Sequence, residues 1–214
     1  MISMGKTDFH DQLQVAANHL SEYDPILAPI IAQHGLPTIA PHADYYAALV
    51  NSIIGQQLSV KAAASIKQRF KDLFGGTLPT PKAILETSHD ELRSVGLSHA
   101  KANYIRDLAE HVRSGRIKFD RIPLQSNAEI IAELTDVKGI GEWTVHMFLM
   151  FCVGRLDVLA SGDLGVRNAI RNLYNFEGAP TPQQVTIVAE QNRWHPYESV
   201  ACWYLWRSLE NSPA

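Results

Sequence analysis

The residues best suited to chemistry lie in and after a glycine turn within residues 134–145. Gly139 and Gly141 allow a tight turn whose Ile140 can enter the core, and the amides that follow begin a helix. The N–H groups at a helix start suit a phosphate oxygen, and Lys138 could add charge. Such contacts position a nucleic acid without reading its bases. The alternative is a plain turn between two core helices, the commoner role of a bare Gly-X-Gly.

Asp163 follows the helix after the turn, inside the run 156–166, and directly precedes a helix predicted over residues 164–173. A carboxylate at this place could perform chemistry beside the phosphate-binding turn. The competing interpretation is an N-cap, because aspartate often accepts a hydrogen bond from the first turn of a helix. Ser161 is open to the same interpretation.

The composition is that of an ordinary globular protein of 214 residues, with 46% hydrophobic and 19% charged residues. The net charge of −3 means that any nucleic-acid contact must come from a local patch or from backbone amides. Cys152 and Cys202 are too few for an iron–sulfur cluster or a four-cysteine zinc site, so side chains are expected to hold no metal. Neither a transmembrane run nor a signal peptide is visible. We therefore expect an intracellular monomer, cytoplasmic in a bacterium, without a membrane partner.

Helical periodicity dominates the chain and predicts an all-α protein of roughly a dozen short helices. Several starts carry capping signals, namely Asp24-Pro25, Ser59, Thr80-Pro81, Ser98 and Thr181-Pro182, with capping boxes at Ser88/Glu91 and Ser126/Glu129. The longer predicted helices cover residues 9–21, 25–33, 45–54, 60–73, 99–113, 127–134, 142–153, 164–173, 183–192 and 196–209. Only residues 157–160 have strand-like composition, and this segment is too short and isolated to build a sheet.

Three motifs in a fixed order carry a resemblance to a known family. The first is Ile-Ile-Gly-Gln-Gln-Leu-Ser at residues 53–59, at the end of an apolar helix. Together with the glycine turn and Asp163, it resembles the helix-hairpin-helix base-excision DNA glycosylases. Within that family the chain is most similar to the alkyladenine branch, DNA-3-methyladenine glycosylase II, over about residues 24–209.

The resemblance implies an all-α, two-lobed fold with a DNA-binding cleft. It implies one domain over residues 1–214, with a hairpin unit at about 126–153. This is the compact form, without the N-terminal β-rich domain of the best-known bacterial relatives. The implied partner is double-stranded DNA that contains damaged bases. No cofactor is expected, although backbone carbonyls at the hairpin could hold a monovalent cation.

For Asp163 the resemblance implies the catalytic role. The reaction would hydrolyse the N-glycosidic bond of a flipped-out alkylated base, such as 3-methyladenine or 7-methylguanine, in base excision repair. Bond cleavage builds positive charge on the deoxyribose, and a nearby carboxylate stabilises that charge. Trp143 stands where strand-cleaving members carry the lysine that forms a Schiff base. This difference implies a monofunctional hydrolase without lyase activity.

The resemblance also assigns further site residues. Four side chains would line the base pocket: Trp143, Tyr197, Met147 and Gln56. The wedge that fills the gap left by the flipped base would be His99, with Leu97 as the alternative. The hairpin and its neighbours would contact the DNA backbone through Lys138, Gly139, Gly141, Gln57 and Thr144.

Ordinary structural roles compete with each of these assignments. Core packing is the alternative for the aromatic residues and, more strongly, for Met147. The other tryptophans, Trp194, Trp203 and Trp206, are expected in the core. Lys61, Lys101 and Arg167 could approach phosphates, although most such charges only solvate a surface.

Other functions remain open at the level of the sequence. A non-catalytic helix-hairpin-helix DNA-binding module would share the turn but would not need Asp163 for chemistry. A glycosylase for uracil or oxidised bases would share the whole fold. An all-α protein-interaction domain would leave the motifs coincidental.

Overall fold

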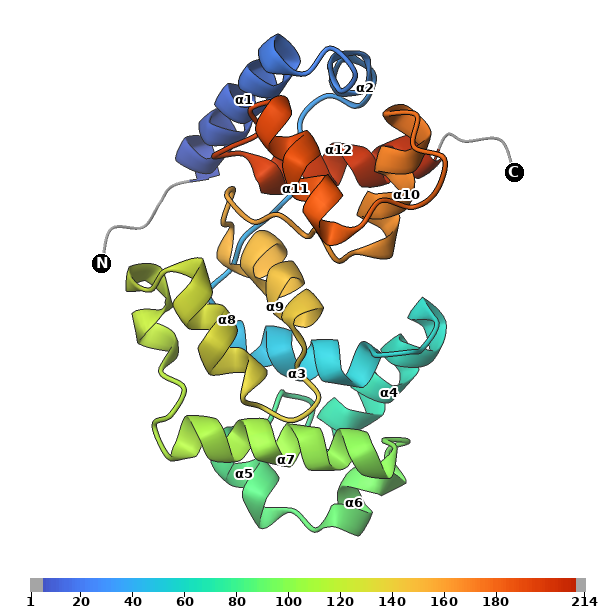
Figure 1. Cartoon of the computed structure of the whole chain (residues 1–214). Coiled ribbons are helices and arrows are strands. Elements are labelled where there is room, and N and C mark those ends of the chain that lie inside the picture. Colours follow the sequence, from blue (N-terminus) through green and yellow to red (C-terminus); the bar gives the residue numbers. More distant parts are fainter. Residues whose placement is uncertain (1–5, 211–214) are drawn as a thin grey trace. The chain divides into compact units, whose positions relative to one another are not determined.

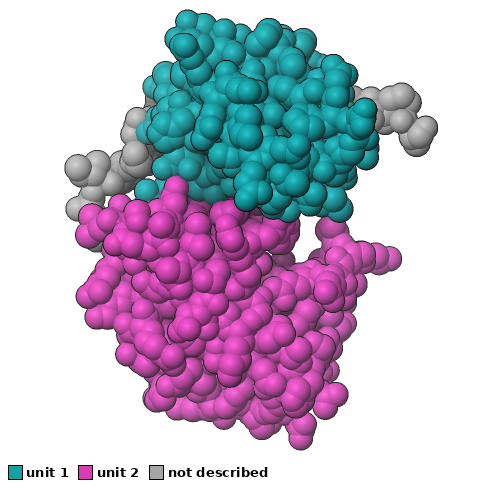
Figure 2. Space-filling view, viewed as in Figure 1, with its two compact units in different colours: residues 1–40, 154–214 teal, residues 41–153 magenta. Residues whose placement is uncertain are grey.

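The structure is a computed structural model that describes residues 6–210. Within that range every regular element is a helix, which confirms the all-α prediction. The chain forms two compact units, shown in different colours in Figure 2. The first unit is made by the chain up to Ala40 and from Gly154 onward, and the second by Pro41–Val153. None of the described helices is long and apolar enough to cross a membrane.

The second unit begins with α3 (Tyr45–Gly55), α4 (Val60–Leu73), α5 (Pro81–Glu86), α6 (His89–Ser94) and α7 (His99–Arg113). It continues with the 3-10 helix η1 (Phe119–Leu124), α8 (Asn127–Thr135), α9 (Glu142–Phe148) and the π-helix η2 (Leu149–Val153). Figure 1 shows α7 beside α3, with α5 and α6 packed on α7.

Helix α3 forms the centre of the second unit. Its Leu49, Val50, Ile53 and Ile54 are completely buried, and the helix packs against α4, α7 and α9. Burying an aliphatic side chain of this size contributes roughly 1.5–3 kcal/mol relative to leaving it exposed. This apolar helix therefore holds the end that carries the Gly-Gln-Gln run at a defined place beside the hairpin.

The predicted helix starts are confirmed where a side chain caps the first turn. The side chains of Ser59, Thr80, Ser98 and Thr181 each accept a hydrogen bond from the backbone three residues later. Both predicted capping boxes, Ser88/Glu91 and Ser126/Glu129, are formed.

Three local predictions need correction. The helix expected from residue 25 is α2, which begins at Ala28. The helix expected over 142–153 is α-helical only to Phe148, and its last turn is the π-helix η2. Helix η1 was not predicted, because a 3-10 turn of this length shows no helical period.

The first unit consists of α1 (Lys6–Tyr23), α2 (Ala28–His34), α10 (Leu164–Leu173), α11 (Pro182–Gln191) and α12 (Glu198–Glu210). Helix α12 contacts α1, α2 and α10, and its Val200, Ala201 and Leu205 are completely buried. It is therefore the central helix of this unit, and it lies against the helix that Asp163 precedes.

Asp24 ties the first unit together from a completely buried position. Its Oδ1 accepts hydrogen bonds from the amides of Ile26 (2.9 Å) and Leu27 (3.0 Å) in the turn before α2. Asp24 therefore does not cap that helix as predicted, since Leu27 stands at its N-cap position. Its Oδ2 accepts hydrogen bonds from the Tyr174 hydroxyl and the Trp194 indole. Burial, followed by the Asp24 charge, raises the pKa of Tyr174. These four donors offset the cost of burying the carboxylate.

Candidate functional site

The glycine turn joins α8 to α9 and buries Ile140 as expected. Gly139 has a φ of +81°, and a Cβ added there would lie 2.1 Å from Cδ2 of Tyr104. Only glycine fits this place without moving the ring. Gly141 has a φ of −92°, and a Cβ added there would meet no atom within 4 Å. Glycine is therefore sterically required at position 139 and not at position 141.

The Gly-Gln-Gln run is hydrogen-bonded to the turn. The side-chain amide of Gln56 donates to the Gly139 carbonyl at 2.8 Å. The ammonium group of Lys101 donates to the carbonyls of Ile54 (2.9 Å) and Gln56 (2.7 Å). Desolvation by burial lowers the pKa of Lys101. Lys101 therefore holds the end of α3, and the Gln56 amide joins α3 to the hairpin. The approach of Lys101 to a phosphate stays a prediction.

Gln57 lies next to this junction and is exposed. Its φ is +55°, in the left-handed region that residues other than glycine rarely adopt. Strained backbone of this kind persists where the surrounding structure requires it. The predicted contact of Gln57 with the DNA backbone is compatible with this exposed position.

A cluster of charged side chains supports the hairpin from α7. The Lys138 amide donates to Oδ2 of Asp107 at 2.9 Å, and its ammonium lies 3.9 Å from Oδ1 of the same carboxylate. His111 is only 4% exposed; its Nδ1 lies 2.8 Å from the Asp107 carbonyl and its Nε2 lies 3.1 Å from Oδ2 of Asp136. Asp107 therefore offsets part of the Lys138 charge, and His111 joins α7 to the residue that ends α8.

The residues predicted on α9 differ in exposure. Trp143 is 53% exposed, which excludes core packing as its role. Thr144 is only 6% exposed. Thr144 and Met147 line a cavity of about 230 Å³, and Ser52 and Cys152 are also part of its wall. The helix turns the Thr144 side chain inward. The predicted contact of Thr144 with the DNA backbone stays a prediction. Cys152 is a free, buried cysteine, and burial raises the pKa of its thiol to about 12.

The two candidates for the wedge are separated by burial. Leu97 is 4% exposed and belongs to the core, whereas His99 is exposed at the first position of α7. The His99 ring lies 4.3 Å from the ring of His89, centroid to centroid. The structure therefore favours His99 over Leu97, and the wedge role itself stays a prediction.

Asp163 caps α10, as the structural interpretation predicted. Its Oδ1 accepts a hydrogen bond from the Val166 amide at 2.8 Å. The same oxygen accepts a second hydrogen bond, also of 2.8 Å, from the indole N–H of Trp206 on α12. The side chain is half-buried. Trp206 was expected only in the core, and no sequence signal could have found its contact, since the partners are 43 positions apart.

Tyr197 directly precedes α12 and is half-buried. Its ring packs edge-on against the ring of His19, with centroids 5.1 Å apart. Nε2 of His19 lies 2.7 Å from the carbonyl of Arg193. Helix α1 thus holds the segment that carries Tyr197. Arg167, one of the charges that could approach phosphates, donates to the carbonyl of Pro180 at 2.6 Å.

Within residues 6–210 no group of three His, Cys, Asp or Glu side chains could hold a metal ion. At the hairpin, the carbonyls of Leu134 and Val137 accept backbone hydrogen bonds, and that of Gly139 accepts one from Gln56. Each oxygen has a second lone pair. The monovalent cation at these carbonyls stays a prediction.

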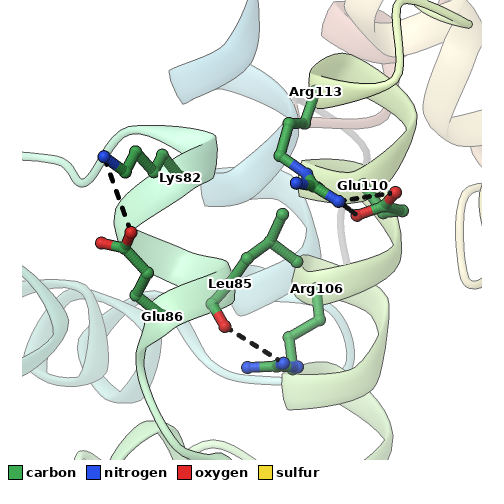
Figure 3. A pocket seen from close by; sticks show the side chains of 6 residues that line it. All are labelled: Lys82, Leu85, Glu86, Arg106, Glu110 and Arg113. Atoms are coloured by element: carbon green, nitrogen blue, oxygen red, sulfur yellow. Dashed lines mark hydrogen bonds and ion pairs between the residues drawn. The ribbon is translucent and has the colours of Figure 1, made fainter.

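A larger open pocket of about 550 Å³ lies between α5 and α7 (Figure 3) and contains no predicted site residue. Lys82 pairs with Glu86 and Arg113 pairs with Glu110 along their own helices. The Arg106 guanidinium donates to carbonyls at the end of α5. The Arg106 contacts join the two helices, whereas the ion pairs lie within each helix.

Comparison with known proteins places this geometry in a family. DNA-3-methyladenine glycosylase 1 of Schizosaccharomyces pombe is 36% identical over 165 residues, which are 76% of this chain and 72% of the relative. The crystal structure of a Bacillus halodurans DNA-3-methyladenine glycosidase has a TM-score of 0.83 and 38% identity, covering 92% of this chain and 89% of that one.

A second solved structure is the S. pombe 3-methyladenine DNA glycosylase Mag1 in complex with abasic DNA. It has a TM-score of 0.80 and 34% identity, covering 92% of this chain and 97% of that one. The profile of the HhH-GPD superfamily matches residues 50–193, which include the Gly-Gln-Gln run, the hairpin and Asp163. The chain therefore belongs to the HhH-GPD superfamily of base excision DNA repair proteins.

Proposed function

We propose that the protein is a monofunctional DNA glycosylase that releases alkylated bases of the 3-methyladenine and 7-methylguanine type from double-stranded DNA. The observation that carries this proposal is the half-buried carboxylate of Asp163, held by two N–H donors in a member of a base-excision family. The named substrates of its relatives support the choice of alkylated bases. A protein with this function acts on the DNA of the cell.

The second unit binds the DNA backbone. The amides at the start of α9, behind a turn that only Gly139 can form, face a phosphate oxygen in this proposal. Gln57 adds an exposed polar side chain, and the Lys138 ammonium adds charge that Asp107 partly offsets. Since these groups read no bases, they hold any sequence in which a damaged base occurs.

The first unit supplies the carboxylate for the chemical step. A methylated purine nucleotide carries positive charge on its base, so the base leaves as a neutral molecule with the electron pair of the glycosidic bond. The sugar carbon C1′ becomes electron-poor, and the Asp163 carboxylate stabilises it. The oxygen of a water molecule then bonds to C1′ and gives up a proton to the carboxylate or to solvent.

Aromatic side chains support the choice of base. An electron-poor methylated purine stacks well on electron-rich rings. Trp143 offers an exposed ring, and Tyr197 offers a ring fixed in place by His19. Met147 borders the cavity on the same helix as Trp143.

A non-catalytic DNA-binding module is the second candidate. The observation that favours it is the capping bond from Val166, which by itself gives Asp163 a structural role. The two functions differ in whether any base is released.

We expect the protein to release methylated purines from DNA treated with a methylating agent, as measured by chromatography of the freed bases. Duplexes that contain uracil or 8-oxoguanine test the alternative substrates and should lose much less base. DNA binding without release of any of these bases would contradict the proposal and support the binding module.

We also expect no covalent protein–DNA adduct after borohydride treatment during the reaction. The reason is that Trp143 stands where a lysine would attack the sugar, and an indole cannot form a Schiff base. A glycosylase with known lyase activity serves as the positive control in the same gel assay. An adduct formed by the wild-type protein would refute the monofunctional mechanism.

A further inference from the structure

One face of α12 lies along the non-helical segment 156–163, which ends at Asp163. The residues on this face are spaced three and four positions apart, as neighbours on a helix are, and comprise Ser199, Cys202 and Trp206. Non-helical backbone needs hydrogen-bond partners when it lies inside a protein, and α12 provides them here.

The contacts run in the same order along both segments. The Ser199 amide donates to the Leu156 carbonyl at 2.9 Å, and its hydroxyl oxygen accepts from the Val158 amide at 3.1 Å. One turn later along α12, the thiol of Cys202 is hydrogen-bonded to the backbone of Ala160. Burial raises the pKa of this thiol to about 12. The last contact is the one between Trp206 and Asp163. The segment is thus held in register up to the carboxylate.

The carboxylate receives two donors that come from different helices. The Val166 amide belongs to α10 and the Trp206 indole to α12, and both donate to Oδ1 at 2.8 Å. A capping bond alone locates one oxygen, whereas a second donor on the same oxygen also restricts rotation of the side chain. Hydrogen bonds to a charged acceptor are stronger than neutral ones. An N-cap needs only the bond from the Val166 amide, so the bond from the Trp206 indole has no capping role.

Gly165 provides the space for this contact. A Cβ at residue 165 would lie 2.9 Å from Cδ1 and 3.0 Å from Nε1 of Trp206, and 3.0 Å from Oδ1 of Asp163. Glycine inside a helix costs stability relative to alanine, so its presence here has a steric reason. At Gly162, on the other side of Asp163, a Cβ would meet no atom within 4 Å.

We infer that Trp206 is a positioning residue for Asp163, and that Gly165 makes room for its indole beside the carboxylate. The inference rests on the proposed glycosylase function, because it assigns Trp206 a part in orienting the catalytic group. Trp206 acts through Asp163 and does not itself contact the substrate in this assignment.

Trp206→Phe tests the inference by removing the N–H while keeping an aromatic ring. We expect the single-turnover rate of base release to fall roughly tenfold to a hundredfold, as for the loss of a hydrogen bond to a charged group. Affinity for a duplex with an abasic-site analogue should stay unchanged. Trp203→Phe is the matched control, since Trp203 is buried on the same helix and packs against Tyr204 and Arg207.

The glycines give a second, independent pair of variants. Gly165→Ala should slow base release as Trp206→Phe does, because the added methyl displaces the indole. Gly162→Ala should release base at the wild-type rate. Equal rates for the wild type and Trp206→Phe, or for the two alanine variants, would overturn the inference.

A spectroscopic measurement keeps this test separate from the proposed function. The indole N–H resonance that disappears in Trp206→Phe identifies Trp206 in the NMR spectrum of the folded protein. We expect that resonance to shift in Asp163→Ala while the other indole resonances keep their positions. An unshifted resonance would overturn the contact even if the protein released no base, whereas absent release in the wild type would contradict only the proposed function.

Discussion

Asp163→Asn is expected to reduce base release at least roughly a hundredfold, the scale seen when one electrostatic stabiliser of a transition state is removed. The substitution removes the charge and little else. An asparagine Oδ1 can still accept from the Val166 amide and the Trp206 indole, and asparagine is as good an N-cap as aspartate. The measurement is the single-turnover rate on methylated DNA, together with the affinity for an abasic-analogue duplex and the unfolding free energy.

DNA affinity and the free energy of unfolding should stay near the wild-type values in this variant. Asp157→Asn is the matched control. Asp157 is an exposed aspartate in the same segment, and its substitution removes the same charge from the protein. Full activity in Asp163→Asn would leave Asp163 with its capping role alone. The non-catalytic module would gain support from a different outcome, the absence of base release by the wild type itself.

Gly139→Ala is expected to lower the free energy of unfolding by roughly 2–4 kcal/mol, from left-handed backbone strain and from overpacking. The backbone at Gly139 has a φ of +81°, and the new methyl would overlap the ring of Tyr104, whose Cγ lies 2.4 Å from the Cβ position. The ring must therefore move as a whole. Because Gln56 donates to the Gly139 carbonyl, the displacement also reaches the Gly-Gln-Gln run. We expect weaker DNA binding in the fraction that still folds.

Denaturant unfolding and DNA titration measure both effects. Gly141→Ala is the control for stability, since an added Cβ at Gly141 meets no atom within 4 Å and the backbone there is extended. The double variant Gly139→Ala/Tyr104→Ala should lose less stability than the sum of the losses in the two single variants, because the overlap between the new methyl and the ring is then absent. A Gly139→Ala protein as stable as the wild type would show that the turn adapts to a side chain.

Local interactions explain why the helices could be predicted so closely. A serine cap such as Ser98 or Ser126 bonds to the backbone three residues later, so its partner is visible in the same stretch of sequence. The predicted bounds of the helices over 60–73, 99–113 and 164–173 match the structure for this reason. The π-helical turn after Phe148 was missed, because it continues the apolar pattern of an ordinary helix.

The sequence by itself determined the all-α class, the glycine turn with its buried isoleucine, and Asp163 at a helix start. Each of these depends on residues within a few positions of one another. Only the tertiary structure decided which distant groups meet. It paired Gln56 with Gly139 across 83 positions and Trp206 with Asp163 across 43, and it buried Leu97 while leaving His99 at the surface. The physical reason is that such contacts depend on how helices pack, and the spacing of residues along the chain carries no record of that packing.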